Sequence, residues 1–213
     1  MIDLETALAR SPVIAILRGV TPDEVFEIGA ALADAGIAII EVPLNSPEPM
    51  RSIGRLAQRF GDRCLIGAGT VMSPDDVAAV AGVGGKLIVM PHSDPDVIAA
   101  ARRAGLACIP GVATPTEGFA ALAAGASALK LFPGEALPPK VVAAWRAVFP
   151  ATVRLIPVGG VNVDTMADYL AAGASGFGIG SALYKPGMRA SEVARNARRM
   201  VGAVDAARGI LSA

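Results

Sequence analysis

The sequence predicts an α/β protein that folds as a (β/α)8 barrel with an extra helix at its N-terminus. Eight short aliphatic runs alternate with alanine-rich stretches, and each run begins about 20 to 27 residues after the previous one, which leaves room for one strand and one helix. Strands that are aliphatic throughout are typical of parallel sheets covered by helices. Eight regular units without a linker favour one closed barrel, and we expect a single domain over residues 1–213.

The order of the expected elements follows the chain. One helix is predicted over Ile2–Arg10, before the first strand, and another over Glu192–Arg208, after the last strand. Between them we expect eight strands, each followed by a helix, as in a TIM barrel. The predicted strands are Val13–Leu17, Ile37–Val42, Cys64–Gly67, Lys86–Met90, Ala107–Ile109, Ala128–Phe132, Arg154–Pro157 and Gly176–Gly180.

Turn-forming residues mark where the helices begin and end. A hydroxyl that can cap a helix stands before a proline at four places, which are Thr21-Pro22, Ser46-Pro47, Ser73-Pro74 and Thr114-Pro115. An acid three residues later predicts capping boxes at Thr21 with Glu24 and at Thr114 with Glu117. An Ala-Gly pair precedes four of the strands, at Ala35-Gly36, Ala104-Gly105, Ala124-Gly125 and Ala172-Gly173, where glycine can close a helix.

Composition excludes several classes of partner. The 19 basic and 19 acidic side chains cancel, so no net charge draws the chain to nucleic acid or to an anionic membrane. No uncharged apolar run reaches the roughly 18 residues of a membrane span, and Met1–Arg10 lacks the pattern of a secretory signal, so we expect a cytoplasmic protein. Cys64 and Cys108 are predicted to be structural free thiols, and His92 is the only histidine. We expect no cofactor and no multi-histidine metal centre, whereas a metal site made of carboxylates alone stays open.

Three charged side chains interrupt the predicted strands, where buried apolar residues are the rule. Arg18 ends the first strand, Glu41 lies near the end of the second and Lys130 lies inside the sixth. Catalytic groups of this fold project from the carboxyl ends of the strands, so the three should meet at one mouth. An apolar wall lowers the pKa of a lysine toward the range in which its neutral amine attacks a ketone, which predicts Lys130 as a Schiff-base nucleophile. Glu41 can then move protons, although a structural Glu41–Lys130 ion pair also explains both burials.

Two glycine clusters follow the seventh and eighth predicted strands. They are Val158-Gly159-Gly160-Val161 and Gly178-Ile179-Gly180-Ser181. Amides freed by glycine at these two positions, and aimed from a helix start, form the usual phosphate cradle of the fold. Tight turns explain either cluster alone, but the two together predict a phosphate held by Gly160, Gly180 and Ser181.

The third predicted strand leads into Thr70. Its hydroxyl and the open amides of the Gly67-Ala68-Gly69 segment can hold a substrate carboxylate, with Arg18 adding a charge-assisted contact. A plain loop into the next helix is the alternative. His92 follows the fourth strand and is expected to be incidental, while Trp145 is expected in the core or at a subunit contact.

These motifs together resemble the 2-keto-3-deoxy-6-phosphogluconate/phosphogalactonate aldolase family. The resemblance spans nearly the whole chain and rests on Leu17-Arg18-Gly19, Glu41-Val42-Pro43-Leu44, Gly67-Ala68-Gly69-Thr70-Val71, Pro110-Gly111, Leu129-Lys130-Leu131-Phe132-Pro133, Gly159-Gly160-Val161 and Gly180-Ser181. It implies a class I, metal-free aldolase, usually a homotrimer, that cleaves a phosphorylated keto-deoxy sugar acid to pyruvate and glyceraldehyde 3-phosphate. It also implies that Lys130 and Glu41 are catalytic, that Arg18 and Thr70 hold the carboxylate, and that the glycine clusters hold the phosphate.

Two positions distinguish the branches of that family. Phosphogluconate enzymes commonly have an arginine shortly after the second strand and a threonine before the double glycine, whereas this chain has Leu44-Asn45-Ser46 and Val158, which is similar to the phosphogalactonate branch. Val158 lacks a hydroxyl that could bond the C4 hydroxyl of one epimer. The resemblance therefore implies 2-dehydro-3-deoxy-6-phosphogalactonate as substrate, with the phosphogluconate epimer as the alternative. More remote alternatives are a phosphosugar isomerase or epimerase and a non-catalytic phosphate-binding barrel.

Overall fold

The computed structural model describes residues 2–211 of the chain, with side chains through residue 209. Its strands are β1 (Val13–Ile16), β2 (Ile39–Pro43), β3 (Leu65–Gly69), β4 (Leu87–Val89), β5 (Ala107–Ile109), β6 (Gly111–Val112), β7 (Leu129–Leu131), β8 (Leu155–Pro157) and β9 (Phe177–Ile179). They pair in parallel in the orders β5-β4-β3-β2-β1-β9 and β6-β7-β8. A parallel bridge between Val158 and Gly178 joins β8 to β9, and the Lys130 amide donates to the Pro110 carbonyl at 2.9 Å. The strands therefore close into a ring.

The fifth position of the ring is divided between β5 and β6. Pro110 separates them because a proline has no N–H to donate to a strand ladder. The chain nevertheless continues around the ring, since the Cys108 carbonyl accepts from the Ser127 amide at 2.8 Å and Gly111 pairs with Lys130. The eight predicted strand positions are confirmed, and the predicted fifth strand is longer than its expected range by the two residues of β6.

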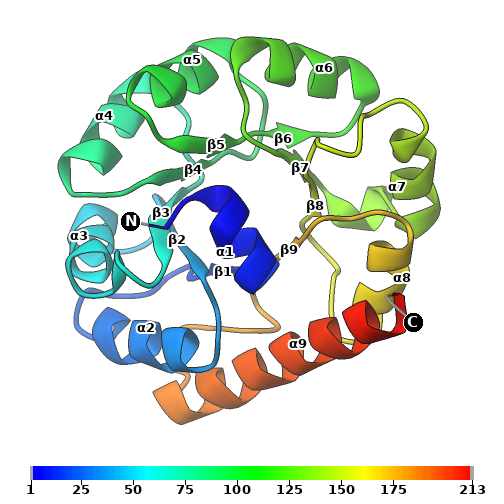
Figure 1. Ribbon diagram of the computed structural model, residues 1–213. Coiled ribbons are helices and arrows are strands. Elements are labelled where there is room, and N and C mark those ends of the chain that lie inside the picture. The colour runs from blue at the N-terminus through cyan, green and yellow to red at the C-terminus, as the bar shows by residue number, and fades with distance from the viewer. Residues whose placement is uncertain (1, 212–213) are drawn as a thin grey trace.

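Helices surround the ring, and α1 crosses its centre (Figure 1). Their bounds are α1 (Leu4–Arg10), α2 (Val25–Asp34), α3 (Pro49–Phe60), α4 (Pro74–Gly82), α5 (Pro95–Arg103), α6 (Pro115–Ala124), the 3-10 helix η1 (Gly134–Ala136), α7 (Pro139–Arg146), α8 (Met166–Ala171) and α9 (Ala190–Leu211). Both predicted terminal helices are present, as α1 and α9. Within the described residues, none of these helices is long and apolar enough to cross a bilayer.

The predicted helix starts are correct at two of the four places. Ser73 caps α4 and Thr114 caps α6, and each has a capping box, the one at Thr114 through Glu117 as predicted. The expectation was wrong at Thr21, because α2 begins at Val25 after a turn in which Glu24 accepts from the Thr21 amide. It was also wrong at Ser46, because α3 begins at Pro49. The Ser46 hydroxyl instead accepts from the Gly19 amide of another loop, at 2.9 Å.

The glycines predicted to end helices all have positive φ, at Gly36, Gly105, Gly125 and Gly173.

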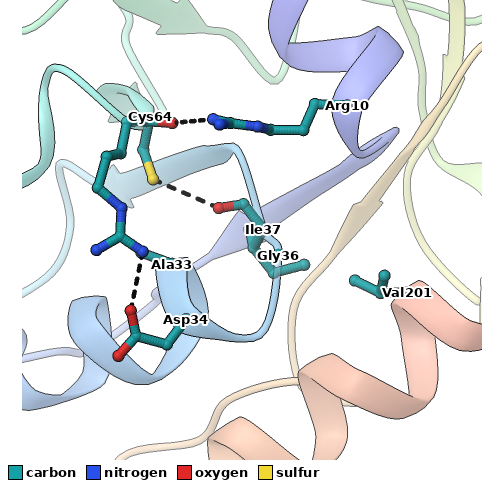
Figure 2. A pocket seen from close by; sticks show the side chains of 8 residues that line it. Arg10, Ala33, Asp34, Gly36, Ile37, Cys64 and Val201 are labelled. Carbon is teal, nitrogen blue, oxygen red and sulfur yellow. Dashed lines mark hydrogen bonds and ion pairs between the residues drawn. The ribbon is translucent and has the colours of Figure 1, made fainter.

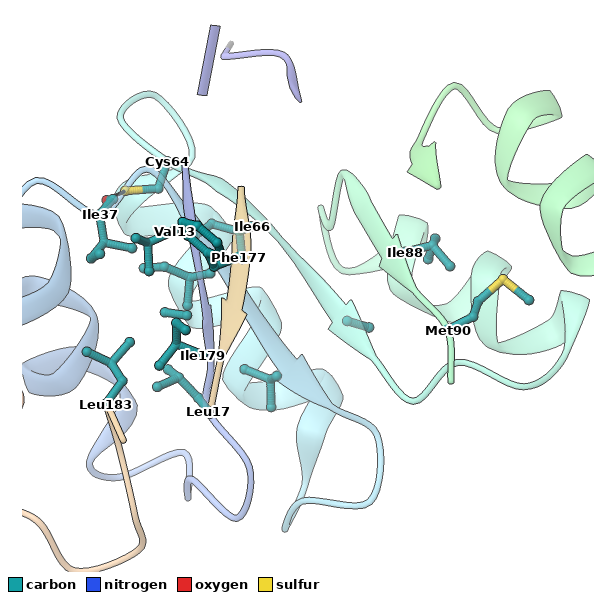
Figure 3. Packing of buried hydrophobic residues seen from close by; sticks show 14 of the residues in the cluster. Val13, Leu17, Ile37, Cys64, Ile66, Ile88, Met90, Phe177, Ile179 and Leu183 are labelled. Atoms are coloured by element: carbon teal, nitrogen blue, oxygen red, sulfur yellow. Dashed lines mark hydrogen bonds between the residues drawn. The ribbon is translucent and has the colours of Figure 1, made fainter. Parts of the chain in front are cut away.

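Apolar side chains form one layer inside the ring and one outside it. Because neighbouring residues of a strand face opposite sides, Ile14 and Ile39 lie inside while Val13 and Phe177 pack outward against the helices (Figure 3). The inner layer includes Leu8 of α1, which leads directly into the amino end of β1 and covers that end of the barrel. The carboxyl end carries no such cover from α1, so the loops there shape any site that opens into the barrel.

Candidate active site

Lys130 and Glu41 point into the barrel above the inner apolar layer. Lys130 follows the inward-facing Ala128 by two residues, and Glu41 likewise follows Ile39, so the two-residue period of a strand turns both inward. Both side chains are buried, with Lys130 8% and Glu41 3% exposed. The sequence-based expectation that these two side chains converge in one place is met, since each contributes to the electrostatic environment of the other.

The space that holds the Glu41 carboxylate is created by Gly69 on the neighbouring strand. A methyl group at Gly69 would overlap the carboxylate, with Glu41 Oε1 only 2.5 Å from its carbon. The strands β2 and β3 are held in register here, because Pro43 pairs with Gly69 and the Leu44 amide donates to the Gly69 carbonyl at 2.8 Å. A side chain at position 69 is therefore incompatible with the observed place of the carboxylate.

Burial moves both groups toward their neutral forms. Desolvation raises the pKa of Glu41 to about 7, although the nearby charges of Lys130 and then Arg18 oppose this shift. Burial also lowers the pKa of the Lys130 ammonium, which Glu41 opposes and Arg18 reinforces. A carboxyl group that titrates near neutrality can both donate and accept a proton, and a lysine with a lowered pKa offers a neutral amine more readily.

Glu41 and Lys130 do not form a direct ion pair with each other. Within the described residues they form no ion pair shorter than 4.0 Å, and Glu41 Oε2 is buried without a hydrogen-bond partner. Lys130 Nζ lies 4.4 Å from the centre of the Phe132 ring, which attracts the ammonium form. The alternative of a structural Glu41–Lys130 ion pair therefore has no support in the geometry.

A pocket of about 370 Å3 opens between the loops that follow β1, β7, β8 and β9. Lys130 and Glu41 do not line it, but Phe132, whose ring centre lies 4.4 Å from Lys130 Nζ, does. The pocket collects most of the residues predicted to bind substrate, which are Arg18, Val158, Gly160, Gly180 and Ser181. Gly159 and Gly160 have φ values of +107° and +68°, a turn that favours glycine twice in succession. The expected helix start after the eighth strand is instead a single turn, in which the Leu183 and Tyr184 amides donate to the Gly180 carbonyl.

Thr70 follows β3, the neighbour of β2 on the side away from β1, and does not line this pocket. It follows Gly69 directly and has a φ of +57°, which is rare for a β-branched residue. Strained backbone of this kind is found mainly at functional sites and costs on the order of 1–3 kcal/mol. Thr70 and Arg18 thus follow the two strands that flank β2, and their joint contact with the substrate carboxylate stays a prediction.

Sequence reasoning left other groups at this mouth open or missed them. Asn45 had no assigned role, and its Oδ1 accepts from Arg18 Nη1 at 2.6 Å. His92 also lies at the carboxyl end, where its carbonyl accepts from the Gly111 amide and its buried Nδ1 has no hydrogen-bond partner in the described residues. Glu135 of η1 was missed although it lines the pocket. Its position in the loop that follows Lys130 was the available signal, because such loops form the sites of barrels.

A second pocket of about 380 Å3 lies at the opposite end, beside the segments that enter β2 and β3 (Figure 2). Its polar groups already bond to one another. Arg10 donates to the Arg63 carbonyl at 2.8 Å, Arg63 donates to Asp34 at 2.8 Å, and the Cys64 thiol donates to the Ile37 carbonyl. Burial raises the pKa of the Cys64 thiol, which disfavours the reactive thiolate. The chemistry of this pocket is therefore much poorer than that of the carboxyl end.

A buried amine and a buried carboxyl group, next to a glycine-lined pocket at the carboxyl end of a (β/α)8 barrel, define a barrel enzyme equipped for carbonyl chemistry. The chain belongs to the KDPG and KHG aldolase family, whose model matches residues 4–199. It is an aldolase, a carbon–carbon lyase.

Named relatives agree with this membership. The chain is 48% identical over 198 residues to a protein of Rhizobium meliloti (strain 1021) named "Probable 2-dehydro-3-deoxy-6-phosphogalactonate aldolase", covering 93% of each. It is 45% identical over 192 residues to the 2-dehydro-3-deoxy-6-phosphogalactonate aldolase of Escherichia coli (strain K12), covering 90% of this chain and 94% of the relative. Among solved structures, one described as "Native KDPGal structure" superposes with a TM-score of 0.91 at 44% identity, covering 93% of this chain and 96% of that one.

Proposed function

We propose that this aldolase cleaves 2-dehydro-3-deoxy-6-phosphogalactonate to pyruvate and D-glyceraldehyde 3-phosphate through a Schiff base on Lys130. The observation that carries the proposal is the buried Lys130 near the buried Glu41, whose Oε2 has no hydrogen-bond partner among the described residues, with a glycine-lined pocket close by. Val158 on the wall of that pocket supports the galactonate epimer, as do the names of the relatives. The phosphogluconate epimer differs only at C4 and is the second candidate.

In the first half of the reaction, the neutral Lys130 amine adds to the C2 ketone and gives a carbinolamine. The protonated Glu41 gives its proton to the departing hydroxyl, so water leaves and an iminium forms. The Glu41 carboxylate then takes the proton of the C4 hydroxyl, directly or through a water. The C3–C4 bond breaks, its electron pair moves to the iminium, and glyceraldehyde 3-phosphate leaves behind an enamine.

In the second half, Glu41 returns its proton to C3 of the enamine. Water adds to the new iminium, Glu41 accepts a proton from it, and collapse of the carbinolamine releases pyruvate and the free amine. Each proton taken by Glu41 is thus returned, and the pKa of about 7 suits both directions of transfer.

The two anionic ends of the substrate are assigned to different walls of the mouth. Gly160, Gly180 and Ser181 hold the phosphate with backbone amides and a hydroxyl, while Thr70, after β3, holds the carboxylate. Arg18 lies between these two walls, because it lines the pocket and its charge also lowers the pKa values of Glu41 and Lys130. We assign it, with Thr70, to the substrate carboxylate, to which its guanidinium adds a charge-assisted contact.

We further propose that the whole chain acts as one catalytic unit in the cytoplasm and assembles as a homotrimer. Exposed apolar side chains offer surface for a subunit contact, among them Phe119, which is 47% exposed and stacks on Phe149, and the neighbouring Val148, which is 55% exposed. Trp145 is not part of that exposed surface, because it is buried against Phe149. Light scattering of the purified protein measures the subunit number.

The Schiff base is tested by incubating the protein with pyruvate, reducing with borohydride and measuring the mass of the protein and of its peptides. We expect a reduced pyruvate adduct on the peptide that contains Lys130, and none in Lys130→Ala. Lys86→Ala is the matched control, because Lys86 is exposed at the amino end of β4, away from the mouth, and its variant should still form the adduct. An unmodified wild-type protein, under conditions in which pyruvate binds, would refute the Schiff base on Lys130.

A further inference from the structure

The pocket beside Lys130 has a carboxylate on its wall that the mechanism above does not use. Glu135 lies on η1 and lines the pocket together with Gly159 and Gly160. Its Oε2 lies only 2.5 Å from the place where a Cβ on Gly159 would be, so the carboxylate rests against the glycine turn. Among the described residues, the Glu135 side chain has no hydrogen bond or ion pair.

The turn that carries Glu135 is held in place from two sides. The Gly134 amide donates to the Val158 carbonyl at 2.8 Å, which ties the turn to the end of β8. The Tyr169 hydroxyl lies 3.2 Å from the Gly134 carbonyl and 3.3 Å from the Leu137 carbonyl, one on each side of Glu135. The backbone of the turn is thereby positioned before any ligand arrives, so the Glu135 side chain extends from a fixed point on the pocket wall.

A carboxylate is an unexpected neighbour for a phosphate, because two like charges repel each other. An ionised carboxylate can only accept hydrogen bonds, so its favourable partner is a donor. The phosphate dianion offers none. The substrate does carry a donor close by, on the carbon next to the phosphoester, which is the C5 hydroxyl of the sugar acid and the C2 hydroxyl of the aldehyde product.

We propose that Glu135 is a specificity-determining residue that accepts a hydrogen bond from the hydroxyl on the carbon next to the phosphoester. The inference rests on the proposed function, because it requires a phosphorylated hydroxyaldehyde in this pocket. With the phosphate on the amides of the glycine turn, the adjacent hydroxyl is the substrate donor nearest to Glu135. Val158 and Phe132, which also line the pocket, are apolar and offer no side-chain acceptor. Glu135 thus selects aldehydes that are hydroxylated beside the phosphoester.

The test compares two aldehydes in the synthetic direction, with pyruvate as the common partner. One is D-glyceraldehyde 3-phosphate, and the other is 3-phosphooxypropanal, which lacks only the hydroxyl. The measured quantity is the ratio of kcat/KM for the two aldehydes, compared between the wild type and its variants. Any intrinsic difference in aldehyde reactivity cancels in that comparison.

In Glu135→Leu the preference for the hydroxylated aldehyde should fall by about tenfold or more, as expected for the loss of a hydrogen bond to a charged group. Glu135→Gln keeps an acceptor oxygen and should retain part of the preference. Asp164→Asn is the charge-matched control. Asp164 lies in the loop after β8 but does not itself line the pocket, so the variant loses one carboxylate charge and should keep the wild-type ratio. Glu135 is exposed, so these substitutions should leave folding intact, which a thermal melt verifies.

Two results would overturn the inference. In one, Glu135→Leu keeps the wild-type ratio. In the other, Asp164→Asn lowers the ratio as much as Glu135→Leu does, which would mean that long-range charge and not a hydrogen bond sets the preference. Pyruvate trapping on the wild type is run in parallel, because absence of the adduct means that the proposed function fails, whereas an adduct with an unchanged ratio means that only the role of Glu135 fails.

Discussion

Gly69→Ala places a methyl group where the Glu41 carboxylate lies. The new carbon would be 2.5 Å from Glu41 Oε1, about 0.9 Å short of the 3.4 Å at which ordinary contact begins, and nearer still to the other carboxylate atoms. Gly69 does not have a positive φ, so the effect of the substitution is steric and not conformational. The strand cannot easily move away, because its pairing with β2 and the bond from the Leu44 amide hold it.

The carboxylate must therefore move by roughly 1 Å, and a displacement of that size at a reacting group costs on the order of 100-fold in rate. We expect kcat for cleavage to fall by about that factor in Gly69→Ala. A coupled assay that consumes pyruvate measures the rate, and circular dichroism shows whether the variant is folded.

Gly202→Ala is the matched control for this experiment. Gly202 lies inside α9, and no neighbouring atom lies within 4 Å of the place that a methyl group there would take. Alanine at this position should therefore raise the stability by roughly 0.5–1 kcal/mol and leave the rate unchanged. If a folded Gly69→Ala enzyme kept a rate within about threefold of the wild type, the argument that catalysis depends on the place of the Glu41 carboxylate would be refuted.

Two further substitutions test the charge state and the epimer preference. Burial raises the pKa of Glu41 from 4.5 to about 7, so the folded state favours the protonated carboxyl group. The resulting contribution of Glu41 to the free energy of unfolding is full below about pH 4.5 and is lost as the pH rises through 7. Wild type should therefore lose up to about 3 kcal/mol more than Glu41→Gln between about pH 4.5 and pH 8 in urea unfolding, and parallel curves would contradict this. Val158→Thr adds a hydroxyl to the pocket wall and should shift the ratio of kcat/KM toward the phosphogluconate epimer by roughly tenfold, whereas an unchanged ratio would show that position 158 does not read C4.

Much of the fold and the central pair could be predicted from the sequence because both depend on local pattern. A charge inside an aliphatic run is anomalous wherever the run folds, and the two-residue period of a strand turns Lys130 and Glu41 to the same side as their apolar neighbours. Glycines such as Gly36 and Gly173 could be predicted at helix ends because glycine, which has no Cβ, adopts the positive φ needed there without a steric penalty.

Predictions from local sequence pattern failed where a segment distant in the sequence competes for the same polar group. Ser46 has the residue type of a helix cap, but the Gly19 amide from another loop takes its hydroxyl. Nothing near position 135 in the sequence indicates that its carboxylate rests against a glycine turn that follows another strand.

The barrel, the buried amine and carboxyl group, and the glycines at the carboxyl end of the last strands could all be predicted from the sequence. Those features follow from periodicity, burial and backbone freedom, which act over a few neighbouring residues. Three other features are visible only in the folded chain: Gly69 makes room for Glu41, Asn45 accepts a hydrogen bond from Arg18, and Glu135 lines the pocket. Each of these depends on which loops meet when the ring closes, and contacts between loops far apart in the chain leave no periodic signal along it.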